Sequence, residues 1–306
     1  MIRLHVMMIV VVFLALVLAA SPVAAQLSLQ WMVPAVANTD GLNGTYWHSD
    51  LSLHNPHSFE LPVVLQFLPS DSDNREADTL YLTLEPWATF NLWDVLGSNY
   101  FATEGTGAIL VFADWDLSCD PTEDCDFLAT SRTYTLDQDG GGGEYGQTIP
   151  GSNTWVGIDW STLGYAAGVL NDGLNFCTNL GISSWSTDWT SVVVDIQDAD
   201  GAIVESFTYQ VPPFGHIQER LPTRVEGGSV VFWLDDGGDD ALVFGYISVV
   251  DQLTGDASFQ LAQPSSVGFA SAKASERTSS RRSVPSVGGT RGPSEVDGRH
   301  LRRRYR

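Results

Sequence analysis

Short apolar runs alternate with turn-forming clusters along most of the chain. In residues 47–54, WHSDLSLH, apolar and polar positions alternate with the period of two that places them on opposite faces of a strand. Runs rich in β-branched and aromatic residues lie between clusters of Asn, Asp, Gly and Pro, at 61–68, 108–112, 191–196, 229–234 and 241–250. Beyond residue 25 no segment keeps a helical period for three turns. The pattern therefore predicts an all-β fold.

The pattern of the first half returns in the second half. At an offset of 129 residues, Trp47 aligns with Phe176, and the run 63–67 aligns with 192–196. Three later blocks align at offsets that fall to 127, 121 and 117: 85–87 with 212–214, 107–114 with 228–235, and 127–131 with 244–248. A preserved order with a shrinking offset indicates a duplicated unit whose second copy has shorter loops. We expect two tandem immunoglobulin-like β-sandwich domains, residues 26–151 and 152–263.

The two ends of the chain differ from this body. Residues 1–25 contain a continuous apolar run followed by Val23-Ala24-Ala25, which predicts a signal peptide cut after Ala25. We therefore expect an exported protein that is secreted, periplasmic or on the cell surface. No later run reaches the length of a membrane span. Residues 264–306 are rich in Ser, Gly, Pro and Arg with almost no large apolar side chains, so we expect a disordered basic tail.

Negative charge is concentrated in the body of the chain. Residues 26–263 contain 34 of the 37 acidic residues but only four of the 15 basic ones. Such a surface repels nucleic acid and anionic lipid, and it favours divalent cations or cationic partners. It also keeps an exported protein soluble.

Three cysteines fit an oxidising compartment. Cys119 and Cys125 flank the short loop DPTED, where a disulfide would brace the end of a hairpin, and Cys177 is left over. The spacing does not fit a zinc site, because a second cysteine pair or a nearby histidine is missing. We expect a Cys119–Cys125 bridge.

Calcium is the one cofactor that the residues suggest. Two acidic loops fall at the same place in the two copies, and clustered carboxylates on a loop supply the oxygen ligands that Ca²⁺ prefers. The candidate ligands are Asp114, Asp116, Asp120, Glu123 and Asp124 in the first copy, and Asp235, Asp236, Asp239 and Asp240 in the second. Neither loop follows the EF-hand pattern, and Asp-Gly turns are also ordinary hairpin chemistry.

Ten tryptophans raise the alternative of carbohydrate binding, since exposed aromatic rings stack on sugar faces. Trp47 and Trp233 stand in apolar strand contexts, which favours a place in the core. Trp185 and Trp189 flank a turn in WSTDW and are the best candidates for an exposed pair.

A series of short motifs runs through the two halves: Val33-Pro34, Trp47-His48-Ser49-Asp50-Leu51, Asn55-Pro56, Ser131-Arg132-Thr133-Tyr134, Asp198-Ala199-Asp200-Gly201 and Pro212-Pro213-Phe214-Gly215-His216-Ile217-Gln218. They resemble the tandem immunoglobulin-like β-sandwich repeat modules of secreted bacterial proteins, over nearly all of residues 30–263. The second copy departs from the pattern at Cys177 and at Ser183-Ser184. The resemblance implies a sandwich fold on an exported or surface protein, and it brings no catalytic residues with it.

Local catalytic signatures such as G-x-S-x-G and H-E-x-x-H are absent from the sequence. A non-local hydrolase site would need His48 or His216 beside a carboxylate and a nucleophile. We expect instead a non-catalytic protein for extracellular or envelope interaction, such as adhesion, whose partner is an extracellular protein or a glycan. A carbohydrate-binding module and a hydrolase are the alternatives.

Overall fold

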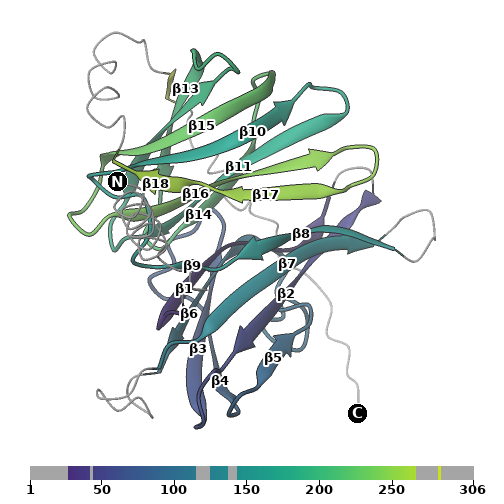
Figure 1. Cartoon of the computed structure of the whole chain (residues 1–306), viewed down its shortest axis with the longest axis vertical. Helices are drawn as coiled ribbons and strands as arrows, with labels where there is room; N and C mark the ends of the chain where they lie inside the picture. The colour runs from purple at the N-terminus through teal and green to yellow at the C-terminus, as the bar shows by residue number, and fades with distance from the viewer. Residues whose placement is uncertain (1–26, 42–43, 115–124, 137–142, 267–281, 284–306) are drawn as a thin grey trace, which may run out of the picture.

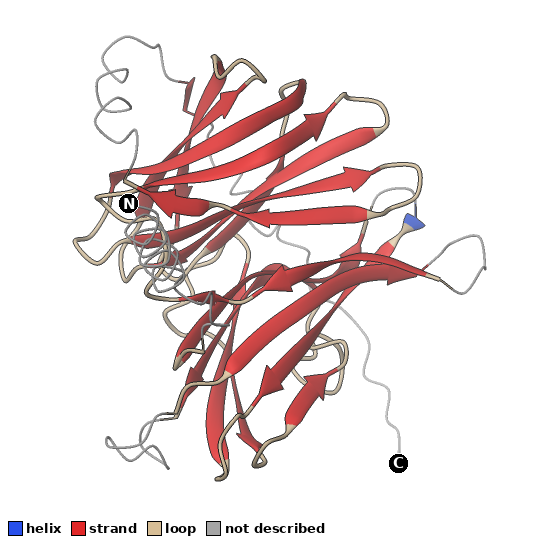
Figure 2. Cartoon of the chain, in the orientation of Figure 1, coloured by secondary structure: helices blue, strands red, loops and turns tan. Residues whose placement is uncertain are grey.

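The computed structural model describes residues 27–41, 44–114, 125–136, 143–266 and 282–283. These residues contain no α-helix, and strands joined by turns build two stacked lobes (Figures 1 and 2). The all-β prediction is confirmed. The same residues include no helix that is long and apolar enough to cross a membrane.

The first lobe is a nine-stranded antiparallel sheet folded into two layers. Its strands, in spatial order, are β4 (Thr79–Leu84), β3 (Leu61–Pro69), β6 (Gly105–Ala113), β1 (Gln30–Asp40), β2 (Tyr46–His54), β7 (Leu128–Leu136) and β8 (Glu144–Pro150), with β5 (Thr89–Leu92) beside β2 and β9 (Ser152–Asn153) beside β1. Strand β1 joins the layers, because its first part pairs with β6 whereas Thr39 and Asp40 pair with β2.

The second lobe consists of two separate sheets. The six-stranded sheet has the order β18 (Gln263–Ser265), β10 (Leu163–Asn171), β15 (Val225–Asp236), β12 (Thr190–Gln197), β13 (Ile203–Val211) and β19 (Arg282–Ser283). The four-stranded sheet has the order β14 (His216–Arg220), β11 (Phe176–Trp185), β16 (Leu242–Asp251) and β17 (Ala257–Leu261).

The two lobes have the same strand order, as a duplicated unit requires. The row β1-β6-β3-β4 corresponds to β10-β15-β12-β13, and the row β5-β2-β7-β8 corresponds to β14-β11-β16-β17. In the first lobe, the rows β7-β2-β5 and β1-β6-β3 match the A-B-E and G-F-C rows of an immunoglobulin sandwich. Strand β1, the first of this copy, takes the position of G, the last strand of an immunoglobulin domain, and β7 takes the position of A, the first. The strand order is therefore that of an immunoglobulin sandwich with its first and last strands exchanged along the chain.

Each sandwich has its own apolar core. Leu51, Leu53 and Ile109 belong to the first core, whereas Leu180 and Ile247 belong to the second. Alternation along β2 and β11 sends these leucines inward, as the period of two predicts.

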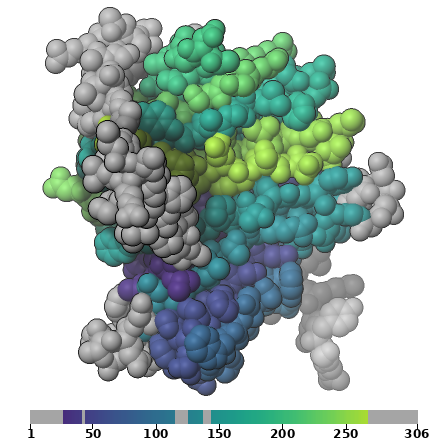
Figure 3. Space-filling view, viewed as in Figure 1, coloured from purple at the N-terminus to yellow at the C-terminus, as the bar shows by residue number. Residues whose placement is uncertain are grey.

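The two sandwiches also share buried contacts. Tyr246 of β16 is fully buried and packs within the core of the first sandwich. A second cluster joins Phe244 to Met32, Leu68 and Leu110 of the first lobe. Figures 1 and 3 show the lobes in contact where β8 lies beside β17. The short junction between the copies therefore leads into a packed interface.

The structure shifts two predicted boundaries. Strand β9 pairs Ser152 and Asn153 with β1, so these residues attach to the first sandwich. Strand β18 pairs Pro264 with Gly164, so order continues past the predicted start of the tail at 264. Both segments satisfy backbone groups at a sheet edge, which outweighs their polar composition. The predicted signal peptide, residues 1–25, lies outside the described residues.

Candidate functional site

A cavity of about 700 Å³ lies between the two sandwiches. Strands β1, β2, β7 and β8 form one wall, strands β11, β14 and β16 form the other, and residues 252–255, which follow β16, line the rim at one side. Leu253 at this side is 89% exposed, so the cavity opens to solvent there. A cavity of this size falls in the range of small-molecule sites in proteins, roughly 300–1,000 Å³.

The first wall combines two aromatic rings with polar groups. Thr135 of β7 pairs with Trp47 of β2 on one side and with Tyr145 of β8 on the other, so the three side chains share one face. The next row on that face brings Thr133 and Gln147 to the cavity. Trp47 and Tyr145 are half-buried, which leaves ring surface open to a ligand.

The second wall is the outer face of the four-stranded sheet. Its register places Asn179 beside Ser248, and both side chains line the cavity. The Ser248 hydroxyl donates to Gln147 Oε1 across the interface at 3.0 Å, which leaves the Gln147 Nε2 group as a donor. This hydrogen bond fixes the distance between the walls at one point.

A glycine lets one tyrosine span the second wall. Gly181 of β11 lies between Tyr246 of β16 and Gln218 of β14 in the sheet register. A Cβ on Gly181 would stand 2.1 Å from Cζ of Tyr246, so only glycine admits the ring there. The ring crosses β11, and its hydroxyl reaches Gln218 Oε1 at 2.8 Å.

A chain of four hydrogen bonds runs behind the cavity and joins the sandwiches. Thr106 Oγ1 and Ser70 Oγ lie 2.7 Å apart, and Ser70 Oγ lies 2.7 Å from Nδ1 of His216. His216 Nε2 lies 2.8 Å from the Tyr246 hydroxyl, which bonds Gln218. Thr106 and Gln218, the two ends of the chain, both line the cavity.

The four hydrogen bonds all run in one direction from donor to acceptor, which the protonation state of His216 determines. Complete burial lowers the pKa of His216 to about 3, so at neutral pH one ring nitrogen donates and the other accepts. Because the Tyr246 hydroxyl donates to Gln218 Oε1, its oxygen accepts from His216 Nε2–H. His216 Nδ1 then accepts from Ser70, and Ser70 accepts from Thr106. Gln218, which lines the cavity, therefore keeps its Nε2 group as a donor.

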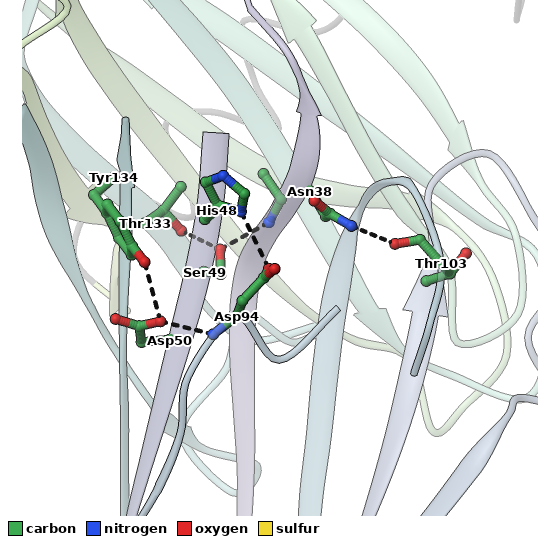
Figure 4. Close-up of polar contacts among 9 residues, drawn as sticks. Asn38, His48, Ser49, Asp50, Asp94, Thr103, Thr133 and Tyr134 are labelled. Atoms are coloured by element: carbon green, nitrogen blue, oxygen red, sulfur yellow. Dashed lines mark hydrogen bonds and ion pairs between the residues drawn. The ribbon is translucent and has the colours of Figure 1, made fainter. Parts of the chain in front are cut away.

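A second polar cluster braces the first wall (Figure 4). Ser49 Oγ accepts from the Ala37 backbone N–H at 2.8 Å and lies 2.6 Å from Thr133 Oγ1. Ala37 and Thr133 both line the cavity. Nearby, Asp50 Oδ1 accepts from the Asp94 backbone N–H at 2.8 Å. These bonds hold β1, β2, β7 and the segment around Asp94 in one arrangement.

The environment of Asp50 depends on a segment distant in sequence. The alternation places Asp50 on the polar face of β2, yet the side chain is buried because the segment around Asp94 covers it. Burial raises the pKa of Asp50, and the hydrogen bond from Asp94 and the charge of Arg132 oppose this effect. His48, on the same face, lies 3.3 Å from Asp94 Oδ1.

The predicted tryptophan pair is divided. Trp189 is 55% exposed, but Trp185 is half-buried and packs its ring edge-on against Phe214 with centroids 5.3 Å apart. Trp185 ends β11 and joins the cluster between the sandwiches, which explains its burial. Trp47, which the sequence favours for the core, lines the cavity instead.

The predicted calcium ligands of the second copy do not converge. Within the described residues, no three Asp, Glu, His or Cys side chains form a group that could hold a metal ion. Asp240 accepts a hydrogen bond from the Thr187 hydroxyl at 3.1 Å, and Asp236 accepts from the Gly237 N–H. Asp114, Asp235 and Asp239 are described as well, whereas Asp116, Asp120, Glu123 and Asp124 lie outside the described residues.

The cysteines occupy different surroundings. Cys125 is buried in the first core, and its predicted partner Cys119 lies outside the described residues, so the bridge stays a prediction. Cys177 is a free, buried thiol that lines the cavity. Burial raises the pKa of the Cys177 thiol, and the nearby charge of Arg220 partly offsets this effect.

The histidines required by a hydrolase have only part of the necessary surroundings. His216 contacts the Ser70 and Tyr246 hydroxyls, but its hydrogen bonds include no carboxylate. His48 lies beside the carboxylate of Asp94 and between the rings of Tyr46 and Tyr134. Among the described residues, neither histidine is bonded to both a carboxylate and an aliphatic hydroxyl.

Sequence reasoning did not identify the cavity residues Tyr145, Gln147, Asn179 and Gln218. They come from three strands, β8, β11 and β14, in two copies and become neighbours only when the sandwiches pack. One signal was available, because Gly181 interrupts an otherwise apolar and polar alternation, and a glycine inside a strand marks a close approach.

Comparisons with known proteins identify no relative by sequence: no protein-family model and no curated protein matches the chain. Among solved structures, a Bifidobacterium dentium β-glucuronidase complexed with coumarin-3-O-glucuronide is similar at 10% identity, covering 71% of this chain and 38% of that chain, with a TM-score of 0.16. A Pleurotus ostreatus lectin in complex with GalNAc is similar at 11% identity, covering 79% and 85%, with a TM-score of 0.14. The chain thus spans well under half of the glucuronidase, and these scores carry no argument about function.

Proposed function

We propose that the chain is an exported, non-catalytic binding protein that holds a neutral saccharide unit in the cavity between its two sandwiches. The observation that carries this proposal is the first wall, where Trp47 and Tyr145 present aromatic rings on the same face as Gln147 and Thr133. A sugar ring offers C–H groups to aromatic faces and hydroxyl groups to amides. Such a ligand matches both kinds of surface.

The polar groups of the cavity favour a hydroxylated ligand over an apolar one. Gln147 and Gln218 each use Oε1 in a hydrogen bond within the protein, and each keeps Nε2 as a donor. An apolar ligand would strip water from these amides without replacing the hydrogen bonds, which costs about 1–3 kcal/mol for each group. Hydroxyl oxygens can accept from both donors, so a saccharide avoids this cost.

The two hydrogen-bonded networks support a site that is formed before the ligand arrives. The chain from Thr106 to Gln218 fixes the donor on the second wall, and Ser49 fixes Thr133 on the first. A preformed site loses little side-chain entropy on binding. Acidic groups at the margin, such as the exposed Asp40, add negative charge, which favours a neutral ligand over an anionic one in this cavity.

A glycan-array screen of the purified full chain tests the proposal, followed by calorimetric titration with the strongest neutral glycan. We expect Trp47→Ala to weaken binding about tenfold, which corresponds to about 1.4 kcal/mol for a stacked ring. Trp155→Ala is the matched control, because Trp155 is 79% exposed and lies outside the cavity.

Two results would contradict the proposal. One is an array without any bound neutral glycan. The other is a glycan whose affinity is the same for Trp47→Ala and the original chain. If Trp189→Ala abolished binding instead, the ligand would sit at the exposed turn that contains Trp189, as in the carbohydrate-binding alternative.

A further inference from the structure

The few arginines of the acidic body fall into two kinds. Residues 26–263 contain only Arg75, Arg132, Arg220 and Arg224. Arg75 pairs with Asp73, and Arg132 pairs with Glu144 at 2.5 Å. The guanidinium groups of Arg220 and Arg224 make no ion pair or hydrogen bond with any residue that the structure describes. Two unpaired cations are unexpected in a segment that contains 34 acidic residues and only four arginines.

Both unpaired arginines line one pocket of about 340 Å³ in the second sandwich. Arg220 ends β14, and Arg224 follows in the next loop, opposite the turn after β10. Gly173 in that turn has a φ of +72°, and a Cβ there would stand 2.7 Å from Nε of Arg224. The glycine therefore allows the guanidinium group to lie against the turn, facing the pocket.

Asn171, which also lines this pocket, has a buried acceptor without a partner. Asn171 is 3% exposed, and its Nδ2 group donates to the carbonyl oxygens of Leu221 and Thr223 at 2.9 and 2.7 Å. These two bonds fix the amide, so Oδ1 is oriented as an acceptor, and Oδ1 has no hydrogen-bond partner among the described residues. A buried polar atom without a partner is costly unless a ligand or water satisfies it.

We propose that Arg220, Arg224 and Asn171 form a binding site for an oxyanion that carries a hydroxyl group beside it, such as a sugar acid or a phosphate monoester. Arginine binds carboxylate and phosphate in a two-pronged arrangement, which supplies the attraction. The neighbouring hydroxyl would donate to Asn171 Oδ1, which a simple carboxylate cannot do. This inference does not rest on the saccharide cavity.

Two carboxylates near the pocket are occupied by other donors. Asp172 Oδ1 accepts from the backbone N–H groups of Leu174, Asn175 and Phe176, which lowers the pKa of Asp172 to about 2. Glu205 accepts from the Thr223 hydroxyl. Neither carboxylate is paired with Arg220 or Arg224, so both arginines remain available for a ligand.

Titration of the ¹⁵N-labelled full chain, followed by NMR at the arginine Nε–H signals, tests this site. We use galacturonate as the probe, galactose as the match without charge, and acetate as the match without a hydroxyl group. We expect galacturonate to bind at least tenfold more tightly than either and to shift the Arg224 signal. Inorganic phosphate is a second probe: preference for phosphate over galacturonate assigns the site to phosphorylated ligands, and the reverse assigns it to sugar acids.

Charge-matched variants distinguish binding in this pocket from general electrostatic attraction to the protein. Arg224→Gln should weaken galacturonate binding at least tenfold, whereas Arg75→Gln removes the same charge outside the pocket and should change it less than twofold. The loss of galacturonate affinity in Arg224→Lys should fall between the losses in these two variants, because lysine keeps the charge without the two-pronged geometry. Trp47→Ala should leave binding of galacturonate unchanged, even if saccharide binding in the cavity fails. Equal losses in Arg224→Gln and Arg75→Gln, or equal affinities for galacturonate and galactose, would overturn the proposal.

Discussion

Acid should weaken the protein through one buried histidine. His216 is fully buried at the interface, and burial lowers its pKa from the ordinary 6.5 to about 3. In the unfolded chain the ring is exposed and takes up a proton near pH 6.5. Between pH 6.5 and 3 the unfolded state therefore binds more protons than the folded state, so His216 makes the free energy of unfolding fall as the pH falls.

The magnitude follows from the gap between the two pKa values. Each pH unit in this window costs about 1.4 kcal/mol, so His216 should remove about 2 kcal/mol of stability between neutral pH and pH 5. The hydrogen-bonded chain gives the structural reason: a proton on Nδ1 would place a donor against Ser70 Oγ–H, which now donates to that atom. Ser70 and Thr106 would then both have to reverse their donors.

Urea unfolding of the full chain at a series of pH values between 7 and 5 measures this effect. Carboxylates also titrate in acid. The informative quantity is therefore the difference between the original chain and His216→Gln in the slope of the free energy of unfolding against pH. We expect the variant to be less stable at pH 7 but to lose about 2 kcal/mol less on acidification to pH 5. Parallel stability curves for the two proteins would refute the reasoning, because they would mean that His216 keeps its ordinary pKa in the folded state.

Three further predictions follow from the same geometry. Gly181→Ala should displace the ring of Tyr246 and destabilise the chain by about 2 kcal/mol, measured by urea unfolding, and an unchanged midpoint would contradict the close approach at Gly181. Asp172→Ala should accelerate amide hydrogen exchange at residues 174–176, whereas Asp172→Asn, which keeps an acceptor, should accelerate it less. Calorimetry of the full chain should give one unfolding transition, because Phe244 and Tyr246 bury themselves against the first sandwich, and two separate transitions would show that the interface is weak.

The strands and the duplication could be predicted because their signals are local or periodic. The alternation in β2 places Leu51 and Leu53 in the core, where the structure has them fully buried. The offsets between the halves reflect the shared strand order of the two lobes. These features depend on side-chain periodicity and turn residues, which act over a few positions of the chain.

The cavity could not be predicted, because it depends on how one sandwich packs on the other. Trp47 has the apolar surroundings of a core residue within its own strand. Its strand pairs with the end of β1, beyond the filled part of the core, and the second sandwich covers this end only in part. Burial of Asp50 by the segment around Asp94 is likewise a tertiary effect, since 44 positions separate the two residues.

The packing of the sandwiches explains why a cavity forms at this place. On β2 and β11 the inward positions correspond, as Leu51 matches Leu180 at the offset of 129. The outward positions of β11 instead face the core side of the first lobe, where Tyr246 packs.

The duplicated strands differ at those outward positions. Ser52 and His54 of β2 correspond to Gly181 and Ser183 of β11. The smaller residues permit the approach: Gly181 admits the Tyr246 ring, and the Ser183 hydroxyl donates to the carbonyl oxygen of Pro34 at 2.9 Å. The outer face of β11 thus forms an interface with the first lobe. The cavity is the space beside the first lobe that this face does not fill. A loss of bulk at outward positions of one copy is a signal that the sequence does carry.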